Sequence, residues 1–500
     1  MCTVTLKEQG IMIQSVPKSR LRKLNSAPVQ GEGEYILYWM TSARRPFDNF
    51  GLQHALHQAH KFGKPLVVLE ALRIDYQWSS ERFHQFVLDG MAVNKSYFDG
   101  KNVTYLPYLE REDGAGKGLL EALAQKACAI VTDYFPCFFI PRMIEAAARK
   151  VDVSLEQVDS NGALPLFDSP RAFTTAYSFR RHLQKEVLPC LLEMPMDECL
   201  AEGSNRPRAP IGRALLERWP MLTSEDLSGN HALSRFNLFT NNHVSRLSYR
   251  GGFEEANRAW SFFLDRKIAR YHEDRNQPEL NIATGLSPYL HFGHVGVHRL
   301  LRELFQCERW NPTCTAAKTT GSRAGWWGMG PAAEAFIDQL LTWRELGYTH
   351  CHHHLDDYEQ FETLPSWALT TLEEHESDPR NPSYNLASLE AAETHDPLWN
   401  AAQRQLVREG RIHNYLRMLW GKKILEWSEH PRLALHHLIE LNNKYSIDGR
   451  NPNSYSGIFW TLGRFDRAWG ARPIFGKVRY MSSENTARKL KVKAYLNQWA

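Results

Sequence analysis

A single predicted helix carries an arginine and two tryptophans on one face, a combination that can hold a charge and pass electrons. The residues of this face recur at alternating steps of four and three, namely His413, Arg417, Trp420, Ile424 and Trp427. A buried arginine needs an anionic or strongly polar partner, and Asp448 follows in a loop with glycine, asparagine and proline. An Arg/Asp pair backed by a file of tryptophans suits a buried flavin that receives electrons from the surface. The helix taken alone favours a plainer interpretation, in which it is amphipathic and its tryptophans belong to the core.

The composition is that of a globular protein with room for two or three domains. The chain has 500 residues, of which 43% are hydrophobic and 23% are charged. It contains no apolar run long enough to cross a bilayer, and residues 1–30 lack the apolar core of a signal peptide. We therefore expect a cytoplasmic protein without a membrane partner. A monomer is also expected.

The charge is unevenly distributed along the chain. The formal net charge is only +4, but residues 461–500 hold nine lysines and arginines against two acidic residues. This local excess of +7 predicts a surface that meets phosphates, with a solvated C-terminal face as the alternative.

The cysteines and histidines do not indicate a metal site. The eight cysteines contain no C-x-x-C pair, which argues against zinc ribbons and suits a reducing compartment. None follows Cys351, which excludes an iron–sulfur cluster in the C-terminal part of the chain. Residues 350–354 include four histidines, but adjacent side chains point in different directions, so we expect a wet loop or a helix end.

Short apolar runs alternate with helical patterns in the first third of the chain. The runs lie at residues 34–40, 65–70, 103–106 and 129–132. This alternation predicts a parallel α/β sheet, and we assign the α/β domain to residues 33–165. Residues 1–32 are predicted to form a disordered basic tail, and residues 166–241 an interdomain connection. Helical periodicity dominates residues 242–500, which predicts an all-α second domain.

Segments of the second half resemble the photolyase/cryptochrome family, and within it the class II cyclobutane pyrimidine dimer photolyases. In chain order they are 271–276 (YHEDRN), 285–293 (GLSPYLHFG), 343–346 (WREL), 394–400 (THDPLWN), 413–427 (the helix above), 448–453 (DGRNPN) and 475–481 (FGKVRYM). They come in the family's order, whereas residues 33–165 resemble the family's antenna domain more weakly. The resemblance implies an N-terminal Rossmann-like antenna domain followed by a helical domain that binds FAD.

The resemblance also implies a set of cofactor-binding residues. The family's FAD is folded into a U shape, and hydroxyl and backbone N–H groups hold its phosphates. Arg417 and Asp448 match the salt bridge beside the isoalloxazine ring, and Asn442 matches the asparagine near flavin N5. Asn451 replaces the family's usual aspartate. The remaining positions are Tyr271, Thr284, Leu286 and Ser287 at the phosphates, and Asn453 at the flavin edge.

Three tryptophans match the family's electron-transfer chain. Trp420 is implied to lie nearest the flavin, Trp399 next, and Trp427 at the protein surface. Aromatic rings in contact allow short hops in place of one long jump. The chain is therefore expected to reduce the flavin when light is absorbed.

The family's lesion pocket takes a flipped dinucleotide between aromatic walls. The residues implied to bind damaged DNA are Trp343, Asn414, Tyr415, Met418, Trp460 and Arg467. Class II enzymes carry a glutamate four residues before the wall tryptophan, where this chain has Gln339. Gln339 can donate an N–H bond but has no proton to transfer, which implies slower repair or its loss. A shift of the alignment by one residue would place Asp338 there instead.

Two functions are consistent with the resemblance. The first is light-driven repair of cyclobutane pyrimidine dimers in DNA, with excited reduced FAD as the electron donor. The alternative is a cryptochrome-like blue-light photoreceptor without repair activity, which the short basic C-terminus disfavours. A dark flavin oxidoreductase is less consistent, because no nicotinamide fingerprint is present. The antenna domain is expected to hold a deazaflavin or a folate, or to be empty.

Overall fold

The computed structural model describes residues 14–201, 207–228, 232–236, 238, 244 and 246–500. Its N-terminal part is a six-stranded sheet in the order β1-β6-β5-β2-β3-β4. The strands are β1 (Leu21–Lys23), β2 (Tyr35–Met40), β3 (Leu66–Leu72), β4 (Thr104–Leu109), β5 (Ala127–Asp133) and β6 (Leu155–Val158). All neighbouring strands pair in parallel except β1, which runs antiparallel to β6. The parallel sheet predicted from the apolar runs is therefore present.

Both faces of this sheet are buried, because side chains alternate between the two faces along each strand. In β2, Ile36 and Tyr38 pack into one apolar cluster, whereas Tyr35 and Leu37 pack into another on the opposite face. The helices that cover the sheet are α1 (Phe50–Phe62), α2 (Glu81–Asp99), α3 (Leu119–Ala124) and α4 (Ile140–Ala148). A strand that is a continuous apolar run in the sequence thus contributes side chains to two hydrophobic cores, one on each face of the sheet.

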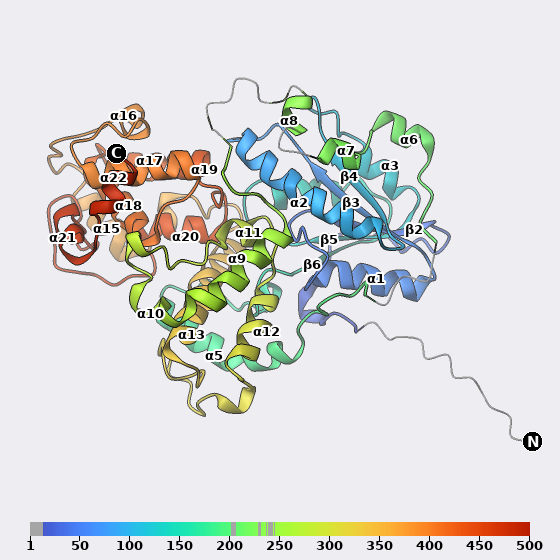
Figure 1. The fold of residues 1–500 in the computed structure, drawn as a ribbon, viewed down its shortest axis with the longest axis horizontal. Helices are drawn as coiled ribbons and strands as arrows, with labels where there is room; N and C mark the ends of the chain where they lie inside the picture. Colours follow the sequence, from blue (N-terminus) through green and yellow to red (C-terminus); the bar gives the residue numbers. More distant parts are fainter. Residues whose placement is uncertain (1–13, 202–206, 229–231, 237, 239–243, 245) are drawn as a thin grey trace, which may run out of the picture.

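The second part of the molecule is helical and lies beside the sheet domain (Figure 1). Its longer helices are α5 (Ala176–Leu192), α9 (Phe253–Arg266), α12 (Val297–Cys307), α14 (Arg344–His353), α15 (Ser366–Glu374), α17 (Pro397–Glu409), α18 (Asn414–Trp427), α19 (Pro431–Tyr445) and α20 (Pro452–Thr461). The shorter ones are α10 (Tyr271–Asp274), α11 (Ser287–His291), α13 (Pro331–Ile337), α16 (Leu386–Glu390), α21 (Ser483–Lys489) and α22 (Lys493–Gln498). A π-helical turn, Asp338–Trp343, joins α13 to α14. Within the described ranges, no helix is long and apolar enough to cross a membrane.

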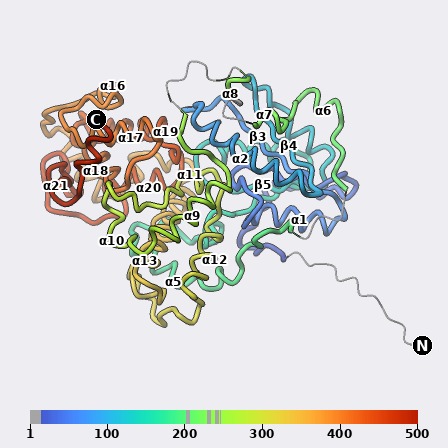
Figure 2. Tube along the Cα trace, in the orientation of Figure 1, coloured from blue at the N-terminus to red at the C-terminus, as the bar shows by residue number. Residues whose placement is uncertain are grey.

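The chain trace brings distant segments of this domain together (Figure 2). The C-terminal helix α22 contacts α17 and the 3-10 turn Pro278–Leu280, and α18 packs against α17, α19 and α20. The elements that the sequence predicts to carry chemistry therefore meet around α18. This arrangement builds the site.

The predicted domain boundaries need correction at both ends of the sheet domain. Within the predicted tail 1–32, strand β1 joins the sheet edge, and the Arg20 guanidinium is buried, donating 2.6 Å to the carbonyl of Ala163. Residues 1–13 lie outside the described residues. Within the predicted connection 166–241, helix α5 belongs to the core of the helical domain.

The remainder of the predicted connection packs on the sheet domain. Leu222, Leu227 and Leu233 share an apolar cluster with α2, and Trp219 packs on the other face of the sheet. Residues 202–206, 229–231, 237 and 239–241 of this segment lie outside the described residues. The helices of this segment are only four to six residues long, which is too short for a helical periodicity to be recognised from sequence.

Candidate functional site

A cavity of about 430 Å³ opens between the helices of the second domain. It is lined by residues of the segment 278–287, by the end of α17 and the start of α18, by Asp448 and Asn453, and by α22. Its volume is within the range of pockets that hold a cofactor. Among the predicted cofactor residues, those lining it are Thr284, Leu286, Ser287, Arg417, Asp448 and Asn453.

The segment before α11 is shaped to receive phosphates. Gly285 adopts a left-handed backbone conformation (φ 72°), and the Thr284 hydroxyl accepts a hydrogen bond of 3.2 Å from the N–H of Leu286. Helix α11 then begins at Ser287. The cavity is also lined by the cations Lys267 and Arg411. Arg411 is paired with Glu409, 3.1 Å away, which also lines the cavity. The hydroxyl groups, the backbone N–H groups and Lys267 together favour an anionic group at this end.

Arg417 and Asp448 come together at the cavity wall, as the sequence suggests. The Arg417 Nη2 atom lies 3.3 Å from Oδ1 of Asp448 and 3.2 Å from the hydroxyl of Ser446. Burial acts to raise the pKa of Asp448, but Arg417 and hydrogen bonds from Ser446 and Ser287 outweigh it and lower this pKa to about 2. Asp448 is therefore a carboxylate at neutral pH, and Arg417 is held in place for a second anionic or polar partner.

His413, at the start of α18, presents an unused hydrogen-bond acceptor. Its Nε2 lies 3.0 Å from the carbonyl oxygen of Arg275, so Nε2 carries the proton. Burial lowers the pKa of His413 to about 4, which keeps the ring neutral. Its Nδ1 is buried without a hydrogen-bond partner among the described residues, and His413 lines the cavity. A ligand with a hydroxyl or amino group, as FAD has along its ribityl chain and adenine, would satisfy this atom, so the cavity fits that cofactor.

The three predicted tryptophans form a continuous aromatic path behind Arg417. The ring centroids of Trp420 and Trp399 are 6.5 Å apart with an interplanar angle of 3°, and those of Trp399 and Trp427 are 5.5 Å apart. The Trp399 indole donates a 3.0 Å hydrogen bond to the carbonyl of Trp420, and the Trp420 indole donates 2.9 Å to Gln403 Oε1. Each ring is thereby held in a defined orientation relative to the next.

The prediction that Trp427 lies at the surface is wrong, because its side chain is only 2% exposed. Tyr384 and His395 cover it, with ring centroids 5.4 and 5.3 Å from that of Trp427. The Tyr384 hydroxyl lies 2.8 Å from Nδ1 of His395, and Tyr384 is partly exposed. The aromatic path therefore reaches solvent through Tyr384. The sequence did not indicate that Tyr384 belongs to the aromatic path. Its only hint was an aromatic residue that precedes the motif containing Trp399.

The predicted lesion-binding residues lie on partly exposed helix faces, except Arg467, which lies in the loop after α20. On α20, Asn453, Gly457 and Trp460 share one face, and the space in front of Gly457 is open. The Trp460 ring centroid lies 4.9 Å from Nζ of Lys422 and 5.6 Å from the Arg479 guanidinium carbon. The other predicted residues with exposed or half-exposed side chains are Trp343, Asn414, Tyr415, Met418 and Arg467. Asn414 is the one of these five that lines the described cavity.

The structure distinguishes Gln339 from its neighbour. Gln339 and Trp343 are both partly exposed on the π-helical turn. Asp338 is buried and accepts a 2.8 Å hydrogen bond from Nε of Arg180. The Asp338 carboxylate is thus already paired, which disfavours the shifted alignment.

Three predicted cofactor residues do not line the cavity. Tyr271 packs among Phe263 and Phe336. Asn442 is buried, and its amide nitrogen donates to Ser454 Oγ (2.7 Å) and to Asn443. The side chain of Asn451 caps α20 by accepting from the N–H of Asn453, and its nitrogen lies 3.0 Å from Nδ1 of His291. Direct flavin contacts for these three stay predictions.

A second cavity, of about 160 Å³, lies between the two domains at the carboxyl ends of β2 and β3. It is mainly apolar, with Tyr76, Phe138 and His291 among its lining residues. Arg450 also lines it, is 3% exposed, and has both Nη atoms without a hydrogen-bond partner in the described part of the chain. Its guanidinium carbon lies 3.5 Å from the ring centroid of Phe83. A buried cation without an anion is costly, so this cavity favours a ligand with a negative or carbonyl oxygen.

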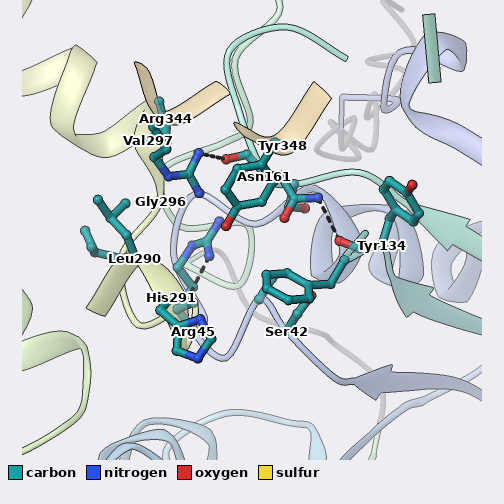
Figure 3. A pocket seen from close by; sticks show the side chains of 15 residues that line it. Ser42, Arg45, Tyr134, Asn161, Leu290, His291, Gly296, Val297, Arg344 and Tyr348 are labelled. Carbon is teal, nitrogen blue, oxygen red and sulfur yellow. Dashed lines mark hydrogen bonds between the residues drawn. The ribbon is translucent and has the colours of Figure 1, made fainter. Parts of the chain in front are cut away.

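A third cavity at the same interface is structural (Figure 3). It measures about 20 Å³, enough for about one water molecule. Around it, Arg45 donates a hydrogen bond of 3.0 Å to the carbonyl of Gly293, and Arg344 donates one of 2.8 Å to the carbonyl of Asn161. These bonds join the two domains.

The architecture and the cavity define the class of protein. A parallel α/β domain followed by a helical domain is also seen in the crystal structure of a bacterial class III photolyase from Agrobacterium tumefaciens. The two structures superpose with a TM-score of 0.62 over 93% of this chain and 86% of that chain, at 14% identity. This likeness establishes a photolyase-type fold.

Sequence comparison with known proteins is more specific. The chain is 32% identical over 485 residues to the deoxyribodipyrimidine photo-lyase of Methanothermobacter thermautotrophicus, covering 96% of this chain and 97% of the relative. The enzyme of the same name from Oryza sativa is 31% identical over 480 residues, covering 93% and 87% of the two chains. The corresponding marsupial protein, from Potorous tridactylus, is 29% identical over 483 residues, covering 95% and 83%. No protein-family model matches the chain.

The chain therefore belongs to the photolyase/cryptochrome family. The family and fold predicted from the sequence motifs are confirmed.

Proposed function

We propose that this chain repairs cyclobutane pyrimidine dimers in DNA by light-driven electron transfer from reduced FAD. The observation that carries the proposal is the aromatic path Trp420–Trp399–Trp427, with centroid spacings of 6.5 and 5.5 Å. Trp420 and Trp427 lie on α18, the helix that also supplies Arg417 to the cavity, and Trp399 lies on the neighbouring α17. When bound and excited by light, reduced FAD supplies the electron that opens the cyclobutane ring, and the electron returns after the ring has split.

The side chains around the cavity have separate tasks in this proposal. Arg417, paired with Asp448, favours a negative charge on the neighbouring ring system. The neutral His413 accepts a hydrogen bond at Nδ1. Thr284 and Ser287 meet the phosphates. These groups bind and orient the cofactor without themselves changing charge.

The lesion is proposed to bind on the open faces of α18, α20 and the π-helical turn. Trp343 and Trp460 would form walls for a flipped dinucleotide. Asn414, which lines the cavity, and the partly exposed Tyr415 and Met418 would supply further contacts. Arg467 is exposed and lies 4.8 Å from the ring centroid of Trp469, which is 38% exposed. Exposed cations beside exposed aromatic rings suit a DNA backbone with unstacked bases.

A second candidate function rests on Gln339. An amide in place of a carboxylic acid supplies no proton to a dimer radical anion, and the only neighbouring acid on that turn, Asp338, is held by Arg180. Photoreduction through the tryptophans does not depend on that proton. A blue-light photoreceptor without repair activity is therefore the alternative.

One assay separates the two functions. Photoreduced protein is mixed with an oligonucleotide carrying a single thymine dimer, illuminated with blue light, and analysed by chromatography against a dark control. Recovery of intact thymines only in the light supports repair. Absence of recovery, in protein that binds FAD and photoreduces it, would favour the photoreceptor.

We also propose that the interdomain cavity holds the antenna chromophore, a planar pigment with an anionic or carbonyl oxygen such as a deazaflavin or a folate. The unpaired Arg450 guanidinium supports this choice of ligand. Chromatography of the pigments released from the denatured protein would reveal a chromophore other than FAD. Arg450→Gln should weaken its retention while leaving FAD bound, and an unchanged pigment content would contradict the assignment.

A further inference from the structure

The C-terminal helix α22 forms part of the wall of the large cavity. Ala494, Tyr495, Gln498 and Trp499 line the same cavity as Arg417. None of the sequence motifs includes this helix. It therefore adds a set of contacts that the predicted cofactor residues do not provide.

Helix α22 is held by side chains that themselves line the cavity. The Glu279 carboxylate accepts hydrogen bonds from the N–H of Ala494 (2.5 Å) and of Tyr495 (3.3 Å). The Tyr495 hydroxyl donates 2.8 Å to Oε1 of Gln405. Glu279 and Gln405 are both cavity residues. The helix thus connects the turn Pro278–Leu280 on one side of the cavity to α17 on the other.

The apolar side of the helix completes this closure. Tyr495 and Trp499 are 3% and 6% exposed, and their ring centroids are 6.4 Å apart. Arg404 donates 3.2 Å to the carbonyl of Trp499. Asn497, by contrast, is exposed and does not line the cavity.

Such a short helix depends on these tertiary contacts for its existence. A helix of six residues is not stable by itself in water, so it opens when its anchors are released. Local opening of this kind costs less than global unfolding. A ligand enclosed by the helix would leave the cavity through such openings.

We propose that α22 is a cofactor-retaining wall, in which Tyr495 and Trp499 contact the bound flavin and Glu279 keeps the helix closed. The inference rests on the flavin site of the proposed function. It predicts that flavin release is limited by opening of α22. It also predicts that bound flavin protects the helix.

Flavin release tests the proposal directly. Holoprotein is diluted, and the fluorescence of released FAD is followed with time for Glu279→Ala, Trp499→Ala and the control Asn497→Ala. Loss of the hydrogen bonds to the charged Glu279 side chain predicts release about tenfold faster or more in Glu279→Ala. Trp499→Ala removes an aromatic side chain from the cavity wall and should also release flavin faster. The control should release flavin at the parental rate.

A second measurement keeps the test valid if Trp499→Ala folds poorly. Tyr495→Phe removes only the bond to Gln405 and should speed release by a few-fold, about two to five. Amide hydrogen exchange of residues 493–499 should slow when FAD is added to the parental apoprotein. The role of α22 would be overturned if well-folded Glu279→Ala and Tyr495→Phe released flavin at the parental rate. It would also be overturned if amide hydrogen exchange of residues 493–499 were the same with and without FAD.

The variant Arg417→Ala distinguishes a failure of the proposal for α22 from a failure of the proposed flavin site. If Arg417→Ala loses flavin while the α22 variants keep it, the flavin site stands and only the role of α22 fails. If Arg417→Ala also releases flavin at the parental rate, the flavin assignment of the cavity is at fault.

Discussion

Replacing Arg417 by alanine gives the sharpest test of the electrostatics of the cavity. The pKa of Asp448 is lowered from 3.8 to about 2, so its interactions stabilise the folded carboxylate by about 2 kcal/mol at neutral pH. Without Arg417, burial is no longer outweighed, and the pKa of Asp448 rises. Removing one partner of a buried ion pair lowers the free energy of unfolding by about 3–5 kcal/mol. Because the Arg417 side chain is 24% exposed, we expect a loss of about 3 kcal/mol.

The pH dependence of that cost distinguishes an ion pair from lost packing. In the parental protein, the contribution of Asp448 is complete above pH 3.8 and is lost as the pH falls toward about 2. In Arg417→Ala the penalty is complete above the raised pKa and disappears as the carboxyl is protonated. The difference in unfolding free energy between the two apoproteins should therefore shrink as the pH falls from 7 to 4.

Denaturant titrations of both apoproteins across this pH range provide the measurement. The double variant Arg417→Ala/Asp448→Asn is the matched control, because it removes the charge that was left alone and should regain much of the lost stability. Arg417→Ala should also be purified with little flavin. A pH-independent difference, or a double variant no more stable than Arg417→Ala, would refute the ion-pair reasoning.

Three further substitutions test the path and the DNA surface. Trp420→Phe should block photoreduction of oxidised flavin but leave repair by chemically reduced enzyme intact, as followed by absorbance and by the dimer assay; loss of both activities would count against a role confined to photoreduction. Gln339→Glu should raise the repair rate severalfold if this side chain faces the dimer, and an unchanged rate would mean that it does not. Arg467→Glu should weaken binding to duplex DNA and reduce the slope of log affinity against log salt by about 1, whereas a parental slope would exclude a phosphate contact.

The fold was largely predictable because its elements have strong local signals. Strands β2 to β5 are apolar runs buried on both faces. In α18, the apolar residues Trp420, Ile424 and Trp427 recur at helical spacing and are all buried. The pairing of Arg417 with Asp448 was also predictable, since a buried arginine requires an anion and a loop aspartate lay downstream. Strand β1 escaped prediction because three residues at a sheet edge, only partly buried, leave no periodic pattern.

The parts of the site that were missed depend on long-range packing. Trp427 looks like a terminal surface residue because the side chain that covers it, Tyr384, lies 43 positions earlier in the chain. Only the structure shows that Nε2 of His413 is bound to the carbonyl of Arg275 and that Nδ1 has no hydrogen-bond partner among the described residues. The helix α22 reads as a basic, polar C-terminus in sequence, and its contact with the cavity is set by Glu279. Each of these contacts joins residues that are far apart in the sequence, so no spacing of nearby residues predicts it.

The loop that follows Ile447 has an optical consequence. Asp448 lines the large cavity of the helical domain and Arg450 lines the interdomain cavity, so wall residues of the two cavities are two positions apart and their Cα atoms at most about 7 Å apart. Asn451 anchors the same loop to α20 and to His291. If a pigment occupied each cavity, this short loop would link the walls that hold them. Excitation passing from one pigment to the other would then depend on the conformation of the loop.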